Sequence, residues 1–383
     1  MASFTLPGKV ITGQRAVEEA APLLPGFGKK ALLVTGKHVG KSPMMQELQN
    51  LLKQYGLDWK VFDGVTGEPT DTMIREGVRM YKEESCDFCI GIGGGSPLDS
   101  AKAIAAMITN PGEIADYNGK NIENPTPPVV AVPTTAGTGS EATKFTIITD
   151  TEKNIKMLLK GEVLLPSLAV VDYRFSLSSP QSVTAATGLD ALTHAVEAFT
   201  SIQAQPLSDV YARSAVKRIL TWLPEAYRDG ENPEARKEMA LAALEAGICI
   251  NNSSVTIVHG MSRPIGALFH VPHGISNAML LNICMGEVRD GAAERFACLG
   301  RETGAAAETD SAEKAAEKFL DKLKEICDIC QVPTLREYGI PEEEYLKSID
   351  KMTMDALASG SPGNCRKKVT EETIKRIYKE AFS

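Results

Sequence analysis

The sequence predicts an α/β N-terminal domain followed by an all-α C-terminal domain. Between about residues 30 and 172, short apolar runs of β-type residues alternate with amphipathic helical stretches. After Ser179 the strand-type runs fade, and helical periodicity dominates to the end of the chain. Because Ser178-Ser179-Pro180 interrupts both patterns, we expect the two domains to span residues 1–179 and 180–383.

The N-terminal elements follow from these patterns in order. Amphipathic stretches at Met44–Tyr55 and Thr72–Lys82 separate the first apolar runs, which favours a parallel sheet covered by helices on both faces. Two short runs, Phe145–Thr149 and Ile155–Leu159, predict a hairpin on that sheet. The predicted strands are Ala31–Thr35, Trp59–Phe62, Phe88–Ile92, Val129–Val132 and Leu168–Val171.

Composition excludes several classes of protein. The 383 residues carry 41 Lys and Arg against 49 Asp and Glu, so a net charge of −8 argues against nucleic-acid binding. No apolar run approaches the roughly 18–20 residues that a membrane span needs. Met1–Gly8 lacks a basic start followed by an apolar core, so we expect no signal peptide and a cytoplasmic protein.

Eight cysteines without an export signal indicate reduced thiols. Two pairs, Cys86/Cys89 and Cys327/Cys330, have the C-x-x-C spacing of zinc ligands. Core packing is the favoured interpretation for both pairs, because the first flanks a buried-type strand and the second lies on the apolar stripe of a helix.

Two glycine-rich turns follow predicted strands. In Gly91–Lys102, Ser96 suits a helix N-cap and Pro97 the first helical position, so a helix should begin there. Exposed N–H groups at such a helix start favour a phosphate, and a tight structural turn is the alternative. The second turn, Pro133–Glu141, brings hydroxyls and glycines to a strand's carboxyl end, where open α/β sheets bind ligands.

The histidines predict a metal site. Asp190 and His194 lie four residues apart in a predicted helix, and hence on one face. Together with His259 and either His270 or His273, they would offer one oxygen and three nitrogens, a donor set that suits iron or zinc. A surface Asp–His pair is the alternative interpretation.

Four motifs together resemble the iron-containing (group III) alcohol dehydrogenase family. They are G-G-G-S-P-x-D-x-x-K at Gly93–Lys102, P-T-T-A-G-T-G-S-E at Pro133–Glu141, G-x-D-A-L-T-H at Gly188–His194, and H-G-M with P-H-G within His259–Gly274. The resemblance runs through nearly the whole chain. It implies a dehydroquinate synthase-like arrangement, in which a dinucleotide-binding α/β domain precedes an all-helical metal-binding domain.

The resemblance also implies a reaction and a set of residues. The reaction is reversible hydride transfer between NAD(P)H and a small aldehyde, with Fe²⁺ or alternatively Zn²⁺, in a homodimer or larger homo-oligomer. By the same resemblance the metal ligands are Asp190, His194, His259 and His273, and His270 is left out. The implied cofactor residues are Gly36, Gly94, Gly95, Ser96, Asp99, Thr134, Thr135, Thr138 and Lys156.

Two positions depart from the family pattern. Arg263 stands where many relatives carry a second histidine, and we expect it to bind an anionic group of the substrate or the cofactor. Short anionic aldehydes such as sulfoacetaldehyde or succinate semialdehyde then become candidates, and a salt bridge to a protein carboxylate is the alternative. Gly36 stands where many relatives carry Asp, so NADP stays an alternative to NAD.

Other functions remain alternatives at this point. Neutral short aldehydes or diols of the lactaldehyde and 1,3-propanediol type would need no anion-binding residue. A zinc enzyme of the glycerol-dehydrogenase or dehydroquinate-synthase kind would share the fold, but the T-T-A-G-T-G-S-E run at Thr134–Glu141 disfavours it. A non-catalytic scaffold of this fold would need a broken metal site or cofactor turn.

Overall fold

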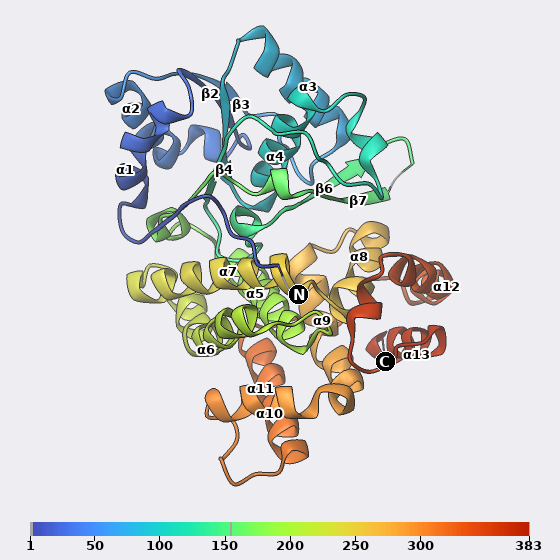
Figure 1. Cartoon of the computed structure of the whole chain (residues 1–383). Helices are drawn as coiled ribbons and strands as arrows, with labels where there is room; N and C mark the ends of the chain where they lie inside the picture. Colours follow the sequence, from blue (N-terminus) through green and yellow to red (C-terminus); the bar gives the residue numbers. More distant parts are fainter. Residues whose placement is uncertain (1–2, 154, 383) are drawn as a thin grey trace. The chain divides into compact units, whose positions relative to one another are not determined.

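The computed structural model describes residues 3–153 and 155–382, which form two compact units. One unit is Thr5–Ser179, and the other is Pro180–Ser383 together with Phe4, whose ring stacks on Tyr211 at 6.1 Å. The first is an α/β unit and the second contains helices, as the sequence predicts (Figure 1).

The α/β unit is built on a six-stranded sheet with the order β1-β8-β5-β4-β2-β3, in which every pairing is parallel. A separate antiparallel hairpin pairs Phe145 with Lys160 at one end and Asp150 with Ile155 at the other. The five predicted strands and the hairpin are confirmed, and a short edge strand, β1, is added. The strands are β1 (Val10–Thr12), β2 (Lys30–Val34), β3 (Asp58–Phe62), β4 (Phe88–Gly93), β5 (Val129–Pro133), β6 (Phe145–Asp150), β7 (Ile155–Lys160) and β8 (Leu168–Val171).

Four helices cover the sheet. Their starts have chemical causes: the Ser42 hydroxyl accepts from the N–H of Met45 at the start of α2, and the Thr70 hydroxyl accepts from Met73 at the start of α3. The helices of this unit are α1 (Ala16–Ala20), α2 (Pro43–Gln54), α3 (Asp71–Glu83) and α4 (Gly95–Thr109).

The sheet has one apolar core on each face, because successive side chains of a strand point to opposite sides. On β2, Ala31 and Leu33 join the core that includes Leu48 of α2, whereas Leu32 and Val34 join the core that includes Ile104 of α4. The strands β4, β5 and β8 are buried at every position, which explains why they carry apolar residues or glycine throughout rather than at alternate positions. Figure 1 shows α1 and α2 on one side of the sheet and α3 and α4 on the other.

The second unit surrounds one central helix. Every residue of α5 from Gly188 to Thr200 is buried, although this stretch contains Asp190, His194 and Glu197. Buried charged groups are costly unless they are paired or bind a metal, so these side chains need a functional or structural partner. The helices are α5 (Gln181–Thr200), α6 (Pro206–Arg228), α7 (Pro233–Ser253), α8 (Ile257–Phe269), α9 (His273–Val288), α10 (Ala293–Glu302), α11 (Ala312–Ile329), α12 (Glu342–Ala358) and α13 (Glu371–Phe382).

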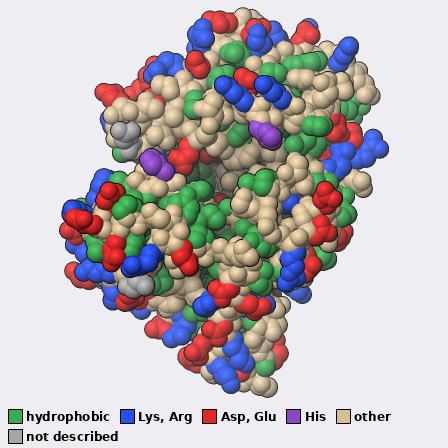
Figure 2. Space-filling model, turned by 180° about the vertical axis from the view of Figure 1, so that it is seen from behind, with side chains coloured by type: hydrophobic (Ala, Val, Ile, Leu, Met, Phe, Trp, Pro, Cys, Tyr) green, Lys and Arg blue, Asp and Glu red, His purple; other side chains and the backbone are tan. Residues whose placement is uncertain are grey.

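Surface and cysteine features agree with the composition. Figure 2 shows acidic and basic side chains interspersed over the visible face. No single helix among the described residues is both long and apolar enough to cross a membrane; α7 and α8 meet that test only as a pair, which is bent by 105°. All eight cysteines are free thiols, and in residues 3–153 and 155–382 none of them joins a cluster able to hold a metal.

Candidate functional site

The glycine turn of the α/β unit ends β4 and begins α4. Gly93 adopts a φ of 151°, a conformation that disfavours any residue with a Cβ atom, and Gly94 is the N-cap of the helix. The sequence prediction that Ser96 is the N-cap is wrong: the helix begins at Gly95, and no side chain caps it. The backbone N–H groups of its first turn are therefore left for a ligand, as the phosphate interpretation requires.

The second predicted turn lies against the first. The N–H of Thr134 donates to the carbonyl of Gly93 at 2.8 Å, and a Cβ atom on Gly95 would lie 2.8 Å from Cγ2 of Thr138. A bulkier residue at 95 would therefore displace Thr138. The absence of a side chain at Gly95 lets the two turns approach each other closely.

The side chains of Asp99 and Lys102, both on α4, bind the segment that follows β5. The Asp99 carboxylate accepts from the Ser140 hydroxyl at 2.5 Å and from the N–H of Ile147 at 2.8 Å. The fully buried Lys102 ammonium donates to the carbonyl and hydroxyl of Thr143 at 2.9 and 3.0 Å. Burial lowers the pKa of Lys102 to about 8, against the opposing effect of Asp99. Asp99 thus contacts the protein's own loop in this structure.

The remaining cofactor candidates lie elsewhere on the same unit. Gly36 follows β2 and forms an isolated bridge with Gly64. Lys156 lies on β7, where its ammonium pairs with Glu68 at 2.6 Å. The structure therefore brings the two turns together, but it does not bring Gly36 or Lys156 into hydrogen-bond contact with either of them in the part of the chain that it describes.

The four predicted metal ligands converge in the helical unit. Asp190 and His194 come from α5, His259 from α8, and His273 is the first residue of α9. Oδ1 of Asp190 lies 3.7, 3.5 and 3.7 Å from Nε2 of His194, His259 and His273, in that order. Donor atoms placed about 2.1 Å from a common tetrahedral centre would be about 3.4 Å apart, so these separations fit a small divalent ion.

The ring arrangement supports the same conclusion. The candidate ligand atoms of Asp190, His259 and His273 all lie within 4.8 Å of one another. His194 is outside this close group, although its ring stacks on that of His259 at 4.5 Å. His270 is the exposed, left-handed residue that ends α8, so the structure selects His273 from the two alternatives.

Comparison with known proteins decides the family. The family profile described as iron-containing alcohol dehydrogenase matches residues 7–173, and the profile for the C-terminal part of the same family matches residues 184–382. The chain belongs to the iron-containing alcohol dehydrogenase family. It is therefore an enzyme, an oxidoreductase of the NAD(P)-dependent alcohol dehydrogenase class, and the family implies a metal ion and a nicotinamide cofactor.

Individual relatives span the whole chain. The NAD-dependent methanol dehydrogenase of Bacillus methanolicus is 36% identical over 386 residues, which cover 100% of both chains. A solved structure of 1,3-propanediol oxidoreductase is 35% identical with a TM-score of 0.96, and covers 100% of both chains. The sulfoacetaldehyde reductase of Bifidobacterium kashiwanohense, solved in complex with NAD⁺, is 26% identical with a TM-score of 0.88, over 100% of this chain and 99% of that one.

The charges of the alcohol dehydrogenase site suit an ion. Burial raises the pKa of Asp190, but the surrounding His194, His273 and His259 outweigh it and hold that pKa below its usual range. Burial lowers the pKa of His194 to about 4 and that of His273 to about 3, so both imidazoles are neutral donors at physiological pH. An ionised carboxylate beside these two neutral imidazoles suits metal binding. Burial lowers the pKa of His259, but the carboxylates of Glu197 and Asp190 outweigh it and raise that pKa, so binding an ion would also displace a proton from this ring.

The sequence analysis did not identify two further residues that contact the candidate metal ligands. Glu197 contacts His259 Nδ1 with its Oε2 at 2.5 Å, and the Asn277 amide donates to Oδ1 of Asp190 at 2.7 Å. Helical spacing could have found both, because Glu197 is three residues after His194 and Asn277 is four after His273, on the ligand-bearing faces of α5 and α9.

Arg263 lies one turn after His259 on α8. Its Nη1 donates to the Ser361 hydroxyl at 3.3 Å, its Nε is buried without a partner, and within residues 3–153 and 155–382 it forms no ion pair. Burial lowers the pKa of Arg263, and the negative charges of Glu197 and Asp190 oppose that shift. The expected alternative, a salt bridge from Arg263 to a protein carboxylate, is therefore not formed in this structure.

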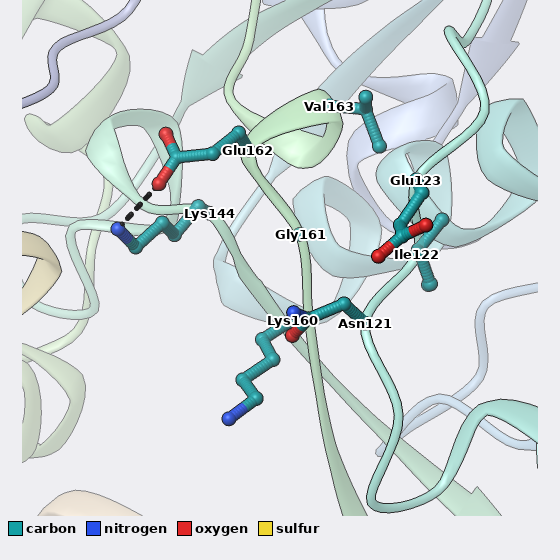
Figure 3. A pocket seen from close by; sticks show the side chains of 8 residues that line it. All are labelled: Asn121, Ile122, Glu123, Lys144, Lys160, Gly161, Glu162 and Val163. Carbon is teal, nitrogen blue, oxygen red and sulfur yellow. Dashed lines mark hydrogen bonds and ion pairs between the residues drawn. The ribbon is translucent and has the colours of Figure 1, made fainter.

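A surface pocket elsewhere on the α/β unit is unrelated to these residues. Figure 3 shows it beside the Lys144–Glu162 ion pair, whose atoms are 2.7 Å apart. No predicted site residue lines it. Its lining residues are Asn121, Ile122, Glu123, Lys144, Lys160, Gly161, Glu162 and Val163.

Proposed function

We propose that this enzyme catalyses reversible hydride transfer between a nicotinamide cofactor and a small aldehyde or alcohol, at a divalent ion held by Asp190, His194, His259 and His273. The observation that carries the proposal is the convergence of three imidazole nitrogens on one carboxylate oxygen at 3.5–3.7 Å inside a buried helix cluster. A bound ion would supply positive charge there, which polarises a carbonyl oxygen and stabilises a developing alkoxide.

Residues of the helical unit would bind the ion, and residues of the α/β unit would bind the cofactor. In the helical unit, the ionised Asp190 and the neutral imidazoles of His194 and His273 offer lone pairs from three directions. In the α/β unit, the uncapped first turn of α4 from Gly95 offers N–H groups to a pyrophosphate. By family resemblance, Ser96 belongs to that turn.

The resemblance assigns the nicotinamide side of the cofactor to the second turn. Thr134, Thr135 and Thr138 lie on this turn, and the N–H of Thr134 joins it to Gly93. Binding the cofactor here would present its reactive carbon in a fixed orientation, which lowers the entropic cost of hydride transfer.

We further propose Fe²⁺ as the ion, with Zn²⁺ as the alternative, and NAD as the cofactor, with NADP as the alternative. An oxygen and three nitrogens suit both ions, so the donor set supports either. Gly36 offers no carboxylate to repel a 2′-phosphate, which keeps NADP open. We propose a cytoplasmic protein, which the eight free cysteines fit, and a homodimer or larger homo-oligomer, as the family resemblance implies.

For the substrate, we propose a short aldehyde with an anionic group that Arg263 binds. A divalent ion together with Asp190, Glu197 and Arg263 carries a net charge of +1 when the imidazoles are neutral, so an anion would balance it. The Arg263 guanidinium also lacks a carboxylate partner in the described chain, and its planar fork suits a carboxylate or sulfonate. A neutral aldehyde or diol is the second candidate, which the names of the methanol and 1,3-propanediol relatives favour.

One experiment tests both the proposed reaction and the proposed class of substrate. The protein is reconstituted with Fe²⁺ under anaerobic conditions and assayed with NADH on sulfoacetaldehyde, succinate semialdehyde, propionaldehyde and lactaldehyde. We expect turnover only after metal loading, and a loss of about 10–100-fold in kcat/KM on anionic aldehydes for Arg263→Leu, the worth of a charged hydrogen bond.

The outcomes separate the proposals. Equal losses by Arg263→Leu on charged and neutral aldehydes would remove anion recognition and leave the neutral substrates. Absence of turnover with every aldehyde, despite one bound ion per chain, would contradict the proposed reaction itself.

A further inference from the structure

A buried carboxylate lies behind one of the candidate metal ligands. Glu197 is fully buried on α5, one turn after His194. Its Oε2 contacts Nδ1 of His259 at 2.5 Å, and its Oε1 accepts from the Thr256 hydroxyl at 2.7 Å and from the N–H of Val258 at 2.6 Å. Both oxygens are therefore occupied by groups at the start of α8, the helix that carries His259.

The contact to His259 selects one form of the ring. A carboxylate oxygen only accepts, so the proton of a neutral His259 must sit on Nδ1, facing Glu197. The lone pair of Nε2 then faces the candidate site, where the Asn277 amide nitrogen lies 3.1 Å and Oδ1 of Asp190 lies 3.5 Å from it. If the proton sat on Nε2 instead, an N–H would point at the place where the ion should bind.

The other oxygen of Glu197 places the helix. Thr256 is the N-cap of α8, but its side chain does not cap the helix. The carboxylate of Glu197, supplied by α5, accepts from the N–H of Val258 in place of that cap. The position of His259, the next residue, thus depends on a contact between α8 and the helix that carries Asp190 and His194.

We propose that Glu197 is a positioning residue of the metal centre, which holds His259 in the Nδ1–H form with Nε2 directed at the ion and thereby sets the affinity for that ion. This inference rests on the metal site of the proposed function. Partners of this kind typically change metal affinity by about 10–100-fold when they are mutated.

The Glu197→Gln variant distinguishes a positioning role of the carboxylate from a role in packing alone. The N–H of Val258 still needs an acceptor, so the glutamine oxygen should take that place and leave the amide NH₂ facing Nδ1 of His259. The amide would then donate to Nδ1 and move the ring proton to Nε2. Glu197→Asp keeps an acceptor on that side and should retain more affinity than the glutamine variant.

A half-buried glutamate in the same unit provides the control. Glu245 lies on α7, where its Oε1 accepts from the Ser214 hydroxyl at 3.0 Å and its Oε2 lies 3.4 Å from Nε of Arg218. Glu245→Gln removes a half-buried carboxylate that contacts none of the four ligands, so it should leave metal affinity unchanged.

The test uses the full chain stripped of metal and titrated with Co²⁺ against a chromophoric chelator. Ion content is measured by elemental analysis, and the ligand field by visible absorption. We expect one ion per wild-type chain, binding 10–100-fold weaker in Glu197→Gln, a smaller loss in Glu197→Asp, and wild-type affinity in Glu245→Gln.

Several results would overturn the proposal. Glu197→Gln binding within twofold of wild type would do so, as would an equal loss in Glu245→Gln, because the effect would then be general. If Glu197→Gln fails to fold, Glu197→Asp decides: a wild-type affinity together with an unchanged Co²⁺ spectrum would refute positioning. A wild type that binds no ion would instead overturn the proposed function along with it.

Discussion

Gly274→Ala should damage the metal centre through a single methyl group. Gly274 follows His273 at the start of α9, and a Cβ atom there would lie 2.1 Å from the carbonyl oxygen of Ala186 on α5. Ala186 precedes Asp190 by one helical turn. The clash therefore falls between the two helices that carry Asp190, His194 and His273.

The size of the effect follows from the geometry. Real Cβ contacts are essentially never shorter than 3.0 Å, so α9 and α5 must separate by about 0.9 Å at this point. Metal sites tolerate changes of only about 0.2 Å in ligand distance. We expect metal affinity to fall at least about tenfold and the helical unit to lose about 1–3 kcal/mol of stability, as overpacked cores do.

Metal titration of the purified variant measures the first effect, and urea unfolding without metal measures the second. The matched control is Gly286→Ala on the same helix, where an added Cβ atom meets nothing within 4 Å. That change should leave metal affinity unchanged and stabilise the helix by about 0.5–1 kcal/mol. A Gly274→Ala chain that binds the ion as tightly as wild type would refute the reasoning.

The next prediction uses the two tryptophans, Trp59 in the α/β unit and Trp222 in the helical unit. Each is the sole reporter in a variant that replaces the other with Phe. Metal at 100 times its Kd should raise the stability that Trp222 reports by about 2.7 kcal/mol. A Trp59 transition that shifts while the Trp222 transition does not would place the ion outside the helical unit. Gly95→Ala should push Thr138 away and weaken NADH binding about tenfold, without changing metal content. Burial raises the pKa of Glu141 to about 7 from 4.5, so the folded α/β unit holds that proton more tightly than the unfolded chain. The stabilisation from Glu141 is full below pH 4.5 and is lost as pH rises through 7. Glu141→Gln should remove about 2–3 kcal/mol of the fall in stability between pH 5 and 8, and a fall as steep as in wild type would count against this cause.

The sequence predicts the strands well because both faces of the sheet are covered. Leu168–Val171 is apolar at every position, and its predicted bounds coincide with β8. The edge strand Val10–Thr12 escapes prediction because three half-exposed residues that pair on one side leave no pattern. The start of α4 differs from the prediction because residue type favours Ser96, whereas the backbone conformation of Gly93 and Gly94 begins the helix earlier.

The candidate metal site is predictable only in part. The spacing of Asp190 and His194 follows from helical geometry, but the residue pattern alone left His270 and His273 as alternatives, and only the family resemblance chose His273. The choice depends on the end of α8, where His270 turns outward in a left-handed conformation. Glu197 has suggestive spacing, yet a glutamate near a histidine is common on exposed helices, and its burial becomes visible only when α5 meets α8.

The ligands of the proposed ion are spread over three helices, from residue 190 to residue 273, a separation of 83 residues. A bound ion would therefore act as a removable cross-link around a large part of the helical unit. Closing a loop of this length restricts an unfolded chain by roughly 4.5 kcal/mol on the scale used for disulfides. Loss of the ion would then leave an enzyme that is both inactive and easier to degrade, so that its cellular abundance should follow the supply of that metal.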